Sequence, residues 1–221
     1  EFAALKSGLD RKMVSQDELA SRGEYFSAKL MAAYLGFAFV DASDWVRFKY
    51  DGSVDQSATY GLLKELDKGF GMVIPGFYGR MPDGKIRTFS RGGSDITGAL
   101  AAAALDADVY ENWTDVSGIV DNPATIPEVT YDELRELSYS GAQVLHEGTI
   151  FPVREKNIPL NIRNTNAPGD AGTMIKESFE GDSDPNRFLT GITGKKDFSI
   201  ISMSKRGLSG EVGYLRKVLS I

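Results

Sequence analysis

The segment Thr88-Phe-Ser-Arg-Gly-Gly-Ser-Asp-Ile-Thr97 decides the fold of this 221-residue chain. An apolar, strand-like run, Met72 to Pro75, comes before it, with Gly76 and Gly79 in between. An alanine-rich run with high helix propensity, Gly98 to Leu105, comes after it. The order is therefore strand, glycine-rich loop and helix, which is typical of an α/β protein.

The loop has the composition of an anion-binding site. Gly92 and Gly93 let backbone N–H groups approach a ligand closely, and we expect Ser94 or Asp95 to cap the helix. The amino end of a helix favours a negative charge. Arg91 adds a cation and Asp95 an anion, which together suit a small, doubly charged substrate beside a phosphate. On physical grounds alone, a helix start with a surface arginine explains the same residues equally well.

Composition and charge exclude several classes of protein. The chain is 42% hydrophobic and 25% charged, as in ordinary globular domains, and its net charge of −6 argues against a nucleic-acid partner. It contains no cysteine and therefore no thiolate metal site, and we assign no metal ligands. Since no apolar run approaches the roughly 18 residues of a membrane span, we expect a cytoplasmic protein without a membrane partner.

Strands alternate with helices along the chain, which predicts an α/β fold with a largely parallel sheet. Helical spacing of apolar residues predicts a helix from Asp17 to Gly36, and we expect its apolar stripe to be core. The stripe of this helix consists of Leu19, Tyr25, Phe26, Leu30, Met31, Tyr34 and Leu35. The next segment, 41–68, is polar, and we expect it to form surface structure. Strands are also expected at 37–40, 72–75, 109–113, 160–163 and 198–203, and helices at 130–137 and 141–146.

The last part of the chain has a different pattern. Residues 176–190 are polar and resemble a linker, and a new strand–loop–helix pattern starts at Phe198. We therefore expect one domain at 1–190 and the start of a second at 191–221. The chain begins with Glu1 and stops at Ile221 inside an apolar-periodic segment, so we expect it to be part of a longer protein.

Several motifs, taken together and in order, resemble the aspartokinases of the amino acid kinase family. The resemblance runs from about Asp17 to the end of the chain, and the number and order of the motifs make it specific. The motifs are Asp17-x-Leu-x-Ser-x-Gly-Glu24, Ile74-Pro-Gly-Phe-Tyr-Gly79, the segment from Thr88 to Asp95, Glu111-Asn-Trp-Thr-Asp-Val-Ser-Gly118, Leu137-Ser-Tyr-Ser-Gly-Ala-Gln-Val-Leu-His146, and Ile162-Arg-Asn-Thr165 with Gly172-Thr173.

The resemblance implies a fold and an activity. The fold is the three-layer α/β amino acid kinase fold with a mainly parallel central sheet, followed by the start of an ACT regulatory domain of ferredoxin-like α+β type. The activity is transfer of the ATP γ-phosphate to the β-carboxylate of L-aspartate, giving 4-phospho-L-aspartate, the first step towards lysine, threonine and methionine. ATP and Mg²⁺ are the implied cofactors. Lysine or threonine is the implied effector, and the implied assembly is a homodimer or higher homo-oligomer through ACT domains.

The resemblance also implies roles for individual residues. Glu24 is expected to pair with the aspartate amine, and Asp95 to organise the catalytic network. The aspartate carboxylates are expected to contact Arg91 and Ser94, with Gly92 and Gly93 beside them. The expected nucleotide-binding residues are Thr114, Asp115, Gln143 and Val144, and the expected effector-binding residues are Leu208 and Ser209.

The chemistry of the residues agrees independently with this activity. A carboxylate nucleophile has a reference pKa of about 3.9 and is already ionised at pH 7, so the reaction needs no general base. The presence of a single histidine is then unremarkable. Phosphoryl transfer instead needs positioning and neutralisation of charge, and an arginine fork suits a carboxylate better than a lysine does.

The sequence departs from the family pattern at three points. The Lys-Phe-Gly-Gly segment that supplies the family's catalytic lysine is absent, and the loop after Gly118 is short and lacks Asp-Pro-Arg. Gln143 stands where many members have a nucleotide-contacting lysine. We therefore expect these residues alone to be inactive. The alternatives are a non-catalytic amino-acid-sensing regulator that keeps the fold, or a kinase for another carboxylate or carbamate.

Overall fold

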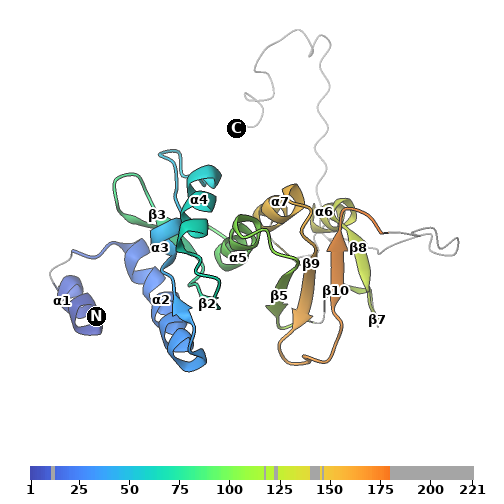
Figure 1. Ribbon diagram of the computed structural model, residues 1–221, viewed down its shortest axis with the longest axis horizontal. Helices are drawn as coiled ribbons and strands as arrows, with labels where there is room; N and C mark the ends of the chain where they lie inside the picture. The colour runs from blue at the N-terminus through green and yellow to red at the C-terminus, as the bar shows by residue number, and fades with distance from the viewer. Residues whose placement is uncertain (11–12, 117, 122–123, 140–144, 146, 180–221) are drawn as a thin grey trace, which may run out of the picture.

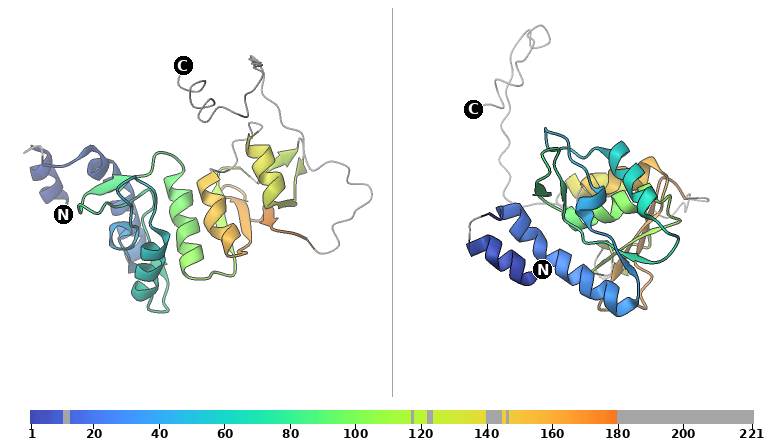
Figure 2. Two further views of the ribbon diagram at one scale, coloured as in Figure 1. Left: turned by 90° about the horizontal axis from the view of Figure 1, so that it is seen from above. Right: turned by 60° about the vertical axis from the view of Figure 1, so that its left-hand side comes forward.

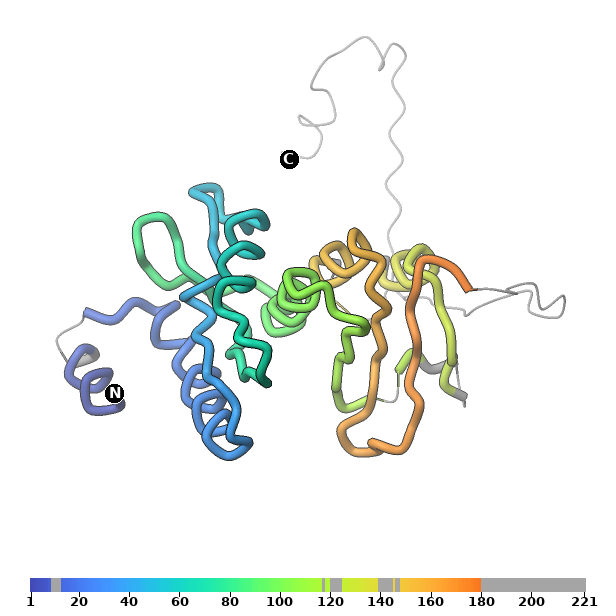
Figure 3. The backbone as a smooth tube through the Cα atoms, in the orientation of Figure 1, coloured from blue at the N-terminus to red at the C-terminus, as the bar shows by residue number. Residues whose placement is uncertain are grey.

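The computed structural model describes residues 1–10, 13–116, 118–121, 124–139, 145 and 147–179. The molecule is elongated, and the described secondary structure forms two halves with helix α5 (Gly93–Ala104) between them (Figure 1). The backbone tube shows the same division, with the blue and teal segments on one side of α5 and the yellow and orange segments on the other (Figure 3).

The described residues of the first half form four helices and two small two-stranded sheets. Strands β1 and β2 pair in parallel, and β3 and β4 form an antiparallel hairpin that the sequence did not predict. The elements are α1 (Phe2–Asp10), α2 (Gln16–Leu35), β1 (Ala38–Phe39), α3 (Ala42–Trp45), α4 (Gln56–Leu66), β2 (Met72–Val73), β3 (Tyr78–Arg80) and β4 (Ile86–Thr88).

Helix α2 has the predicted bounds because both of its ends are capped. The Ser15 side chain accepts a hydrogen bond from the Glu18 N–H at 3.1 Å, and Gly36 ends the helix at a φ of 70°. The expected core stripe is wrong, however: Leu30 and Tyr34 are 74% and 86% exposed. The buried positions of this helix are the small residues Ser21, Ala28 and Ala32, because the helix packs closely against its neighbouring strands through that face.

The segment 41–68 is also not the surface structure that was expected. Trp45, Val46 and Leu63 are completely buried, and they belong to the hydrophobic core of the first half. Two short helices present them, and Asp41 and Asp55 cap these helices with their carboxylates. The four residues of α3 are too few to reveal a period in the sequence.

Helix α5 joins the two hydrophobic cores. Leu100 and Ala104 pack into the core of the first half, and Ala99 and Ala102 pack into that of the second. The alanine-rich sequence therefore does more than favour a helix: small side chains on both faces let the two halves approach the same helix.

The second half is built on a four-stranded sheet of order β5-β9-β10-β8. The pairs β5–β9 and β10–β8 are parallel, and only β10–β9 is antiparallel, which confirms a mainly parallel α/β arrangement. Strands β8 and β10 were not predicted. The sheet strands are β5 (Tyr110–Thr114), β8 (Glu128–Thr130), β9 (Leu160–Asn164) and β10 (Thr173–Lys176), and a small hairpin is formed by β6 (Val120–Asp121) and β7 (Ala124–Thr125).

Two helices accompany this sheet. Helix α6 (Tyr131–Tyr139) starts with the expected Thr130, whose hydroxyl and N–H contact the Glu133 carboxylate in a capping box. Helix α7 (Glu147–Glu155), which was not predicted, packs beside α5 (Figure 2). Of the expected helix at 141–146, the structure describes Leu145 alone, which lies in a bend. The expected domain at 191–221 lies outside the described residues. Within the described ranges, no helix is both long and apolar enough to cross a membrane.

Candidate active site

The glycine-rich loop ends at the first turn of α5, where the chain is closely packed. Gly92, at a φ of 58°, is the N-cap, so the expectation that Ser94 or Asp95 caps the helix is wrong; both lie in its first turn. The reason is the left-handed backbone of Gly92, which starts the helix two residues before Ser94 could cap it. A Cβ atom on Gly93 would lie 2.9 Å from Phe77 Cα, and one on Gly76 would lie 2.8 Å from Ser94 Cα. Only glycine fits at either position.

Phe77 has a strained backbone beside this turn. Its φ of 84° is unusual for a residue with a side chain. The Phe77 N–H donates to the Thr97 hydroxyl at 3.1 Å, and the Phe77 carbonyl accepts from the Phe89 N–H at 2.9 Å. Strain that the surrounding contacts hold in place is a feature of binding and catalytic sites.

Asp95 is fixed by two residues of strand β5 that the sequence interpretation did not single out. The Asn112 side-chain nitrogen lies 3.1 Å from Asp95 Oδ1, and the Tyr110 hydroxyl donates to the Asp95 carbonyl at 3.1 Å. Asn112 is 7% exposed, and burial raises the pKa of Tyr110 to about 12. The only signal in the sequence is the strand alternation, which places both side chains on the face that meets α5.

Arg91 and Glu24 have unpaired charges in the described part of the chain. Neither side chain forms a hydrogen bond or an ion pair with a described residue. Glu24 follows Asp17 by seven residues and therefore lies on the same face of α2. The Asp17 carboxylate accepts from the Thr88 hydroxyl at 2.8 Å, so that face of the helix is turned towards β4. Ser94 is exposed, as is Arg91.

Thr114 and Asp115 lie at the carboxyl end of β5, which is the edge where open α/β sheets bind ligands. The Thr114 carbonyl accepts from both the N–H and the hydroxyl of Thr165, at 2.8 and 3.0 Å, which ties this end to the segment after β9. Thr114 follows Asn112 by two residues on the same face of β5, about 7 Å further along. The first turn of α5 and this strand end are therefore neighbours. Gln143, Val144, Leu208 and Ser209 lie outside the described residues.

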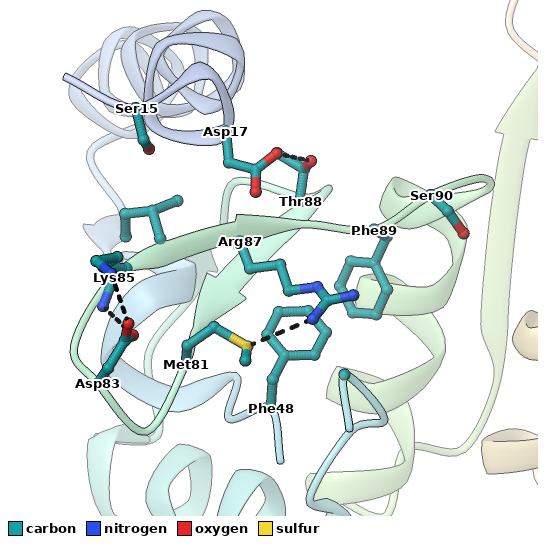
Figure 4. A pocket seen from close by; sticks show the side chains of 12 residues that line it. Ser15, Asp17, Phe48, Met81, Asp83, Lys85, Arg87, Thr88, Phe89 and Ser90 are labelled. Carbon is teal, nitrogen blue, oxygen red and sulfur yellow. Dashed lines mark hydrogen bonds and ion pairs between the residues drawn. The ribbon is translucent and has the colours of Figure 1, made fainter. Parts of the chain in front are cut away.

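A pocket of 520 Å³ lies beside the expected substrate residues but is not lined by them. It is bounded by the start of α2 and by the β3–β4 hairpin, and Ser90 stands at one side (Figure 4). The Arg87 guanidinium lies 5.9 Å from the centre of the Phe48 ring in this pocket. Since Ser90 directly precedes Arg91, the pocket borders the expected site. Among the described side chains, no group of three or more acidic or histidine residues could hold a metal ion.

The family model described as "Amino acid kinase family" matches residues 1–164. Aspartokinase 3 of Bacillus subtilis is 37% identical over 93% of this chain and 48% of its own length, and Aspartokinase 1, chloroplastic, of Arabidopsis thaliana is 31% identical over 94% and 40%. The chain therefore spans about half the length of the curated relatives that it matches, or less.

The solved structures that this chain resembles are also aspartokinases. The crystal structure of Clostridium acetobutylicum aspartate kinase is 46% identical to this chain, with a TM-score of 0.81, over 99% of this chain and 52% of that one. E. coli aspartokinase III in complex with aspartate and ADP is 30% identical, with a TM-score of 0.68, over 75% and 41%. These likenesses confirm the expected kinase fold.

Proposed function

This chain belongs to the amino acid kinase family, and we propose that it forms most of the catalytic domain of an aspartokinase. The enzyme would transfer the γ-phosphoryl group of ATP to the side-chain carboxylate of L-aspartate, giving 4-phospho-L-aspartate in the route to lysine, threonine and methionine. The observation that carries this proposal is the first turn of α5. There, Asn112 holds the Asp95 carboxylate by a hydrogen bond, and Arg91 has no partner among the described residues. The two residues flank the Gly92–Gly93 backbone at the start of the helix.

Recognition of L-aspartate is assigned to charges that have no partner within the described chain. Arg91 and Ser94 would hold the substrate carboxylates, and the N–H groups of Gly93 and Ser94 at the start of α5 would add hydrogen bonds. Glu24, on the face of α2 turned towards β4, would pair with the α-amine. A substrate with two carboxylates and an amine matches this set, because Arg91, Ser94 and the backbone N–H groups suit the carboxylates and Glu24 suits the amine.

The nucleotide is assigned to the neighbouring carboxyl end of β5. Thr114 and Asp115 would contact ATP, together with Gln143 and Val144 outside the described residues. Bound ADP in the E. coli aspartokinase III structure supports this part of the proposal. Mg²⁺ would neutralise phosphate charge, and since it is usually bound through one or two carboxylates and the phosphate oxygens, Asp95 or Asp115 suffices as a protein ligand.

The chemistry follows from the placement of these groups. The substrate carboxylate oxygen attacks the γ-phosphorus, and the bond from that phosphorus to the β–γ bridging oxygen breaks as ADP leaves. Because the carboxylate carries no proton at neutral pH, no base has to remove one. Asp95, held by Asn112 and Tyr110, would orient the cationic groups around the transferred phosphoryl group.

The regulatory part of the proposal concerns residues outside the described ranges. We assign 1–190 to the kinase domain and 191–221 to the start of an ACT domain, with Leu208 and Ser209 at an effector site for lysine or threonine. The E. coli aspartokinase III structure in complex with lysine and aspartate supports this. The full-length protein would form a homodimer or higher homo-oligomer through its ACT domains. It would act in the cytoplasm.

The test is an assay of the full-length gene product with ATP, Mg²⁺ and L-aspartate, in which hydroxylamine traps the acyl phosphate as a hydroxamate. We expect a signal that requires both substrates, and none with L-glutamate. No aspartate-dependent hydroxamate would overturn the proposal. If calorimetry then still detected binding of lysine or threonine, the non-catalytic regulator would be the better interpretation.

A further inference from the structure

We propose that Asn112 is a positioning residue that holds the Asp95 carboxylate in the orientation needed for phosphoryl transfer. The inference rests on the proposed function, because it gives Asp95 its place in the reaction. It adds a residue from outside the segment Thr88 to Asp95, since Asn112 lies on a different element, 17 positions further along the chain than Asp95.

The contact is specific in its geometry. The Asn112 side-chain nitrogen donates to Asp95 Oδ1 at 3.1 Å and also contacts the Tyr110 hydroxyl at 3.3 Å. That hydroxyl in turn donates to the Asp95 carbonyl at 3.1 Å. Two alternate residues of one strand therefore fix both the backbone and the side chain of a single residue in the first turn of α5.

Tight packing at the same place restricts movement of the helix. A Cβ atom on Gly98 would lie 2.5 Å from the Tyr110 hydroxyl oxygen, so α5 sits directly against β5 just one turn after Asp95. This close approach of α5 to β5 brings the amide of Asn112 within hydrogen-bond distance of the Asp95 carboxylate. The hydrogen bond then selects one rotamer of Asp95 from the staggered set.

A purely structural role for Asn112 makes a different prediction. Position 112 is a buried strand position facing a helix, where an apolar residue of similar size packs equally well. If the amide served packing alone, its replacement by leucine would alter stability and leave the rate of the bound complex unchanged. If it positions Asp95, its replacement lowers kcat even in a folded enzyme, because small misplacements of a catalytic group are costly.

The chain offers a matched control in Asn161 of β9. Asn161 is 8% exposed, donates its side-chain N–H to the Ala171 carbonyl at 3.3 Å, and pairs in register with Glu111 of β5. It is thus a buried strand asparagine beside Asn112 without contact to Asp95. Asn161→Leu removes the same groups from the same sheet, so it reports the cost of losing a buried amide.

The experiment measures kcat, both KM values and the melting temperature of the full-length protein and of N112L, N112D and N161L. We expect N112L to lower kcat about tenfold or more while the KM for aspartate and for ATP change by less than about threefold. N112D keeps the shape but faces Asp95 with a second carboxylate, so we expect at least the same loss of kcat. N161L should lower the melting temperature and keep the wild-type kcat.

The outcomes separate this inference from the proposed function. An active wild type with N112L and N112D both within about twofold of its kcat would overturn the positioning role alone. A wild type without aspartate-dependent turnover would overturn the proposed function and the inference with it. N112D keeps the fold testable if N112L does not fold, since it is nearly isosteric with asparagine.

Discussion

The Thr88 hydroxyl donates a hydrogen bond to the Asp17 carboxylate at 2.8 Å and thereby connects β4 to the first turn of α2. The two residues are 71 positions apart, and each belongs to a motif that carries a proposed substrate residue, Arg91 in one case and Glu24 in the other. This contact therefore links the two motifs that carry the proposed aspartate-binding residues.

Thr88→Val should weaken this connection. Valine has the shape of threonine but cannot donate, so we expect the free energy of unfolding to fall by about 1 kcal/mol, the usual value for one hydrogen bond. We also expect the KM for aspartate to rise more than the KM for ATP. Urea unfolding and steady-state kinetics measure both quantities. Thr88→Ser keeps the donor and serves as the control; equal changes in the two variants would contradict the prediction.

The ion pairs of Asp106 should make the free energy of unfolding fall as the pH is lowered into the acid range. Its carboxylate contacts Lys156 and Lys64, both at 2.9 Å, and these hydrogen bonds lower its pKa to about 2 from an ordinary 3.8. A carboxylate whose pKa is lower in the folded than in the unfolded state stabilises the fold at pH values above its ordinary pKa of 3.8. This contribution to the free energy of unfolding disappears as the pH falls through about 2.

Asp106→Asn removes the charge and tolerates the left-handed φ of 49° at this position. The melting temperature of the variant should be below that of the wild type at pH 6, and the difference should shrink between about pH 4 and pH 2. Calorimetric scans at several pH values test this. A difference that stays constant down to pH 2 would show that the ion pairs contribute nothing.

The parts of the fold that the sequence predicted correctly are those with local causes. Ser15 and Gly36 cap α2 through their own side chain and backbone, and the alanine run of α5 has high intrinsic helix propensity. Trp45 and Phe48 were assigned to a surface segment because their burial depends on Leu63 and Leu100, which lie far away in the sequence. Such contacts leave no period in the sequence to detect.

In the candidate site, too, the sequence indicated the residues of one local segment and missed a residue whose partner lies on another element. The loop residues were proposed as a binding site because glycine, arginine and aspartate occur together where a helix was expected to start. Asn112 was not, because its role depends on a partner on another element. The cap was assigned to Ser94 or Asp95 from side-chain preference, whereas the left-handed backbone of Gly92 decides it.

Arg91→Lys should separate the two substrates. Lysine keeps the positive charge but loses the planar fork that binds a carboxylate with two hydrogen bonds. We expect the KM for aspartate to rise about tenfold or more, while the KM for ATP changes by less than about threefold. Arg135→Lys on α6, where the arginine is partly exposed and forms ion pairs only with neighbouring residues of its own helix, is the control. Equal losses for both substrates would contradict the assignment of Arg91 to aspartate.

Gly93→Ala tests whether the first turn of α5 must lie against the strained Phe77. The new methyl group would be 2.9 Å from Phe77 Cα and from Phe89 Cβ, and neither backbone can move without breaking the contacts that hold Phe77. We expect a loss of about 1–3 kcal/mol in the free energy of unfolding, as for an overpacked core, together with a higher KM for aspartate. Gly61→Ala in α4 is the matched control, because its methyl group would meet nothing within 4 Å and should stabilise the helix by about 0.5–1 kcal/mol. If both variants stabilise the protein, the close approach between Gly93 and Phe77 does not exist in solution.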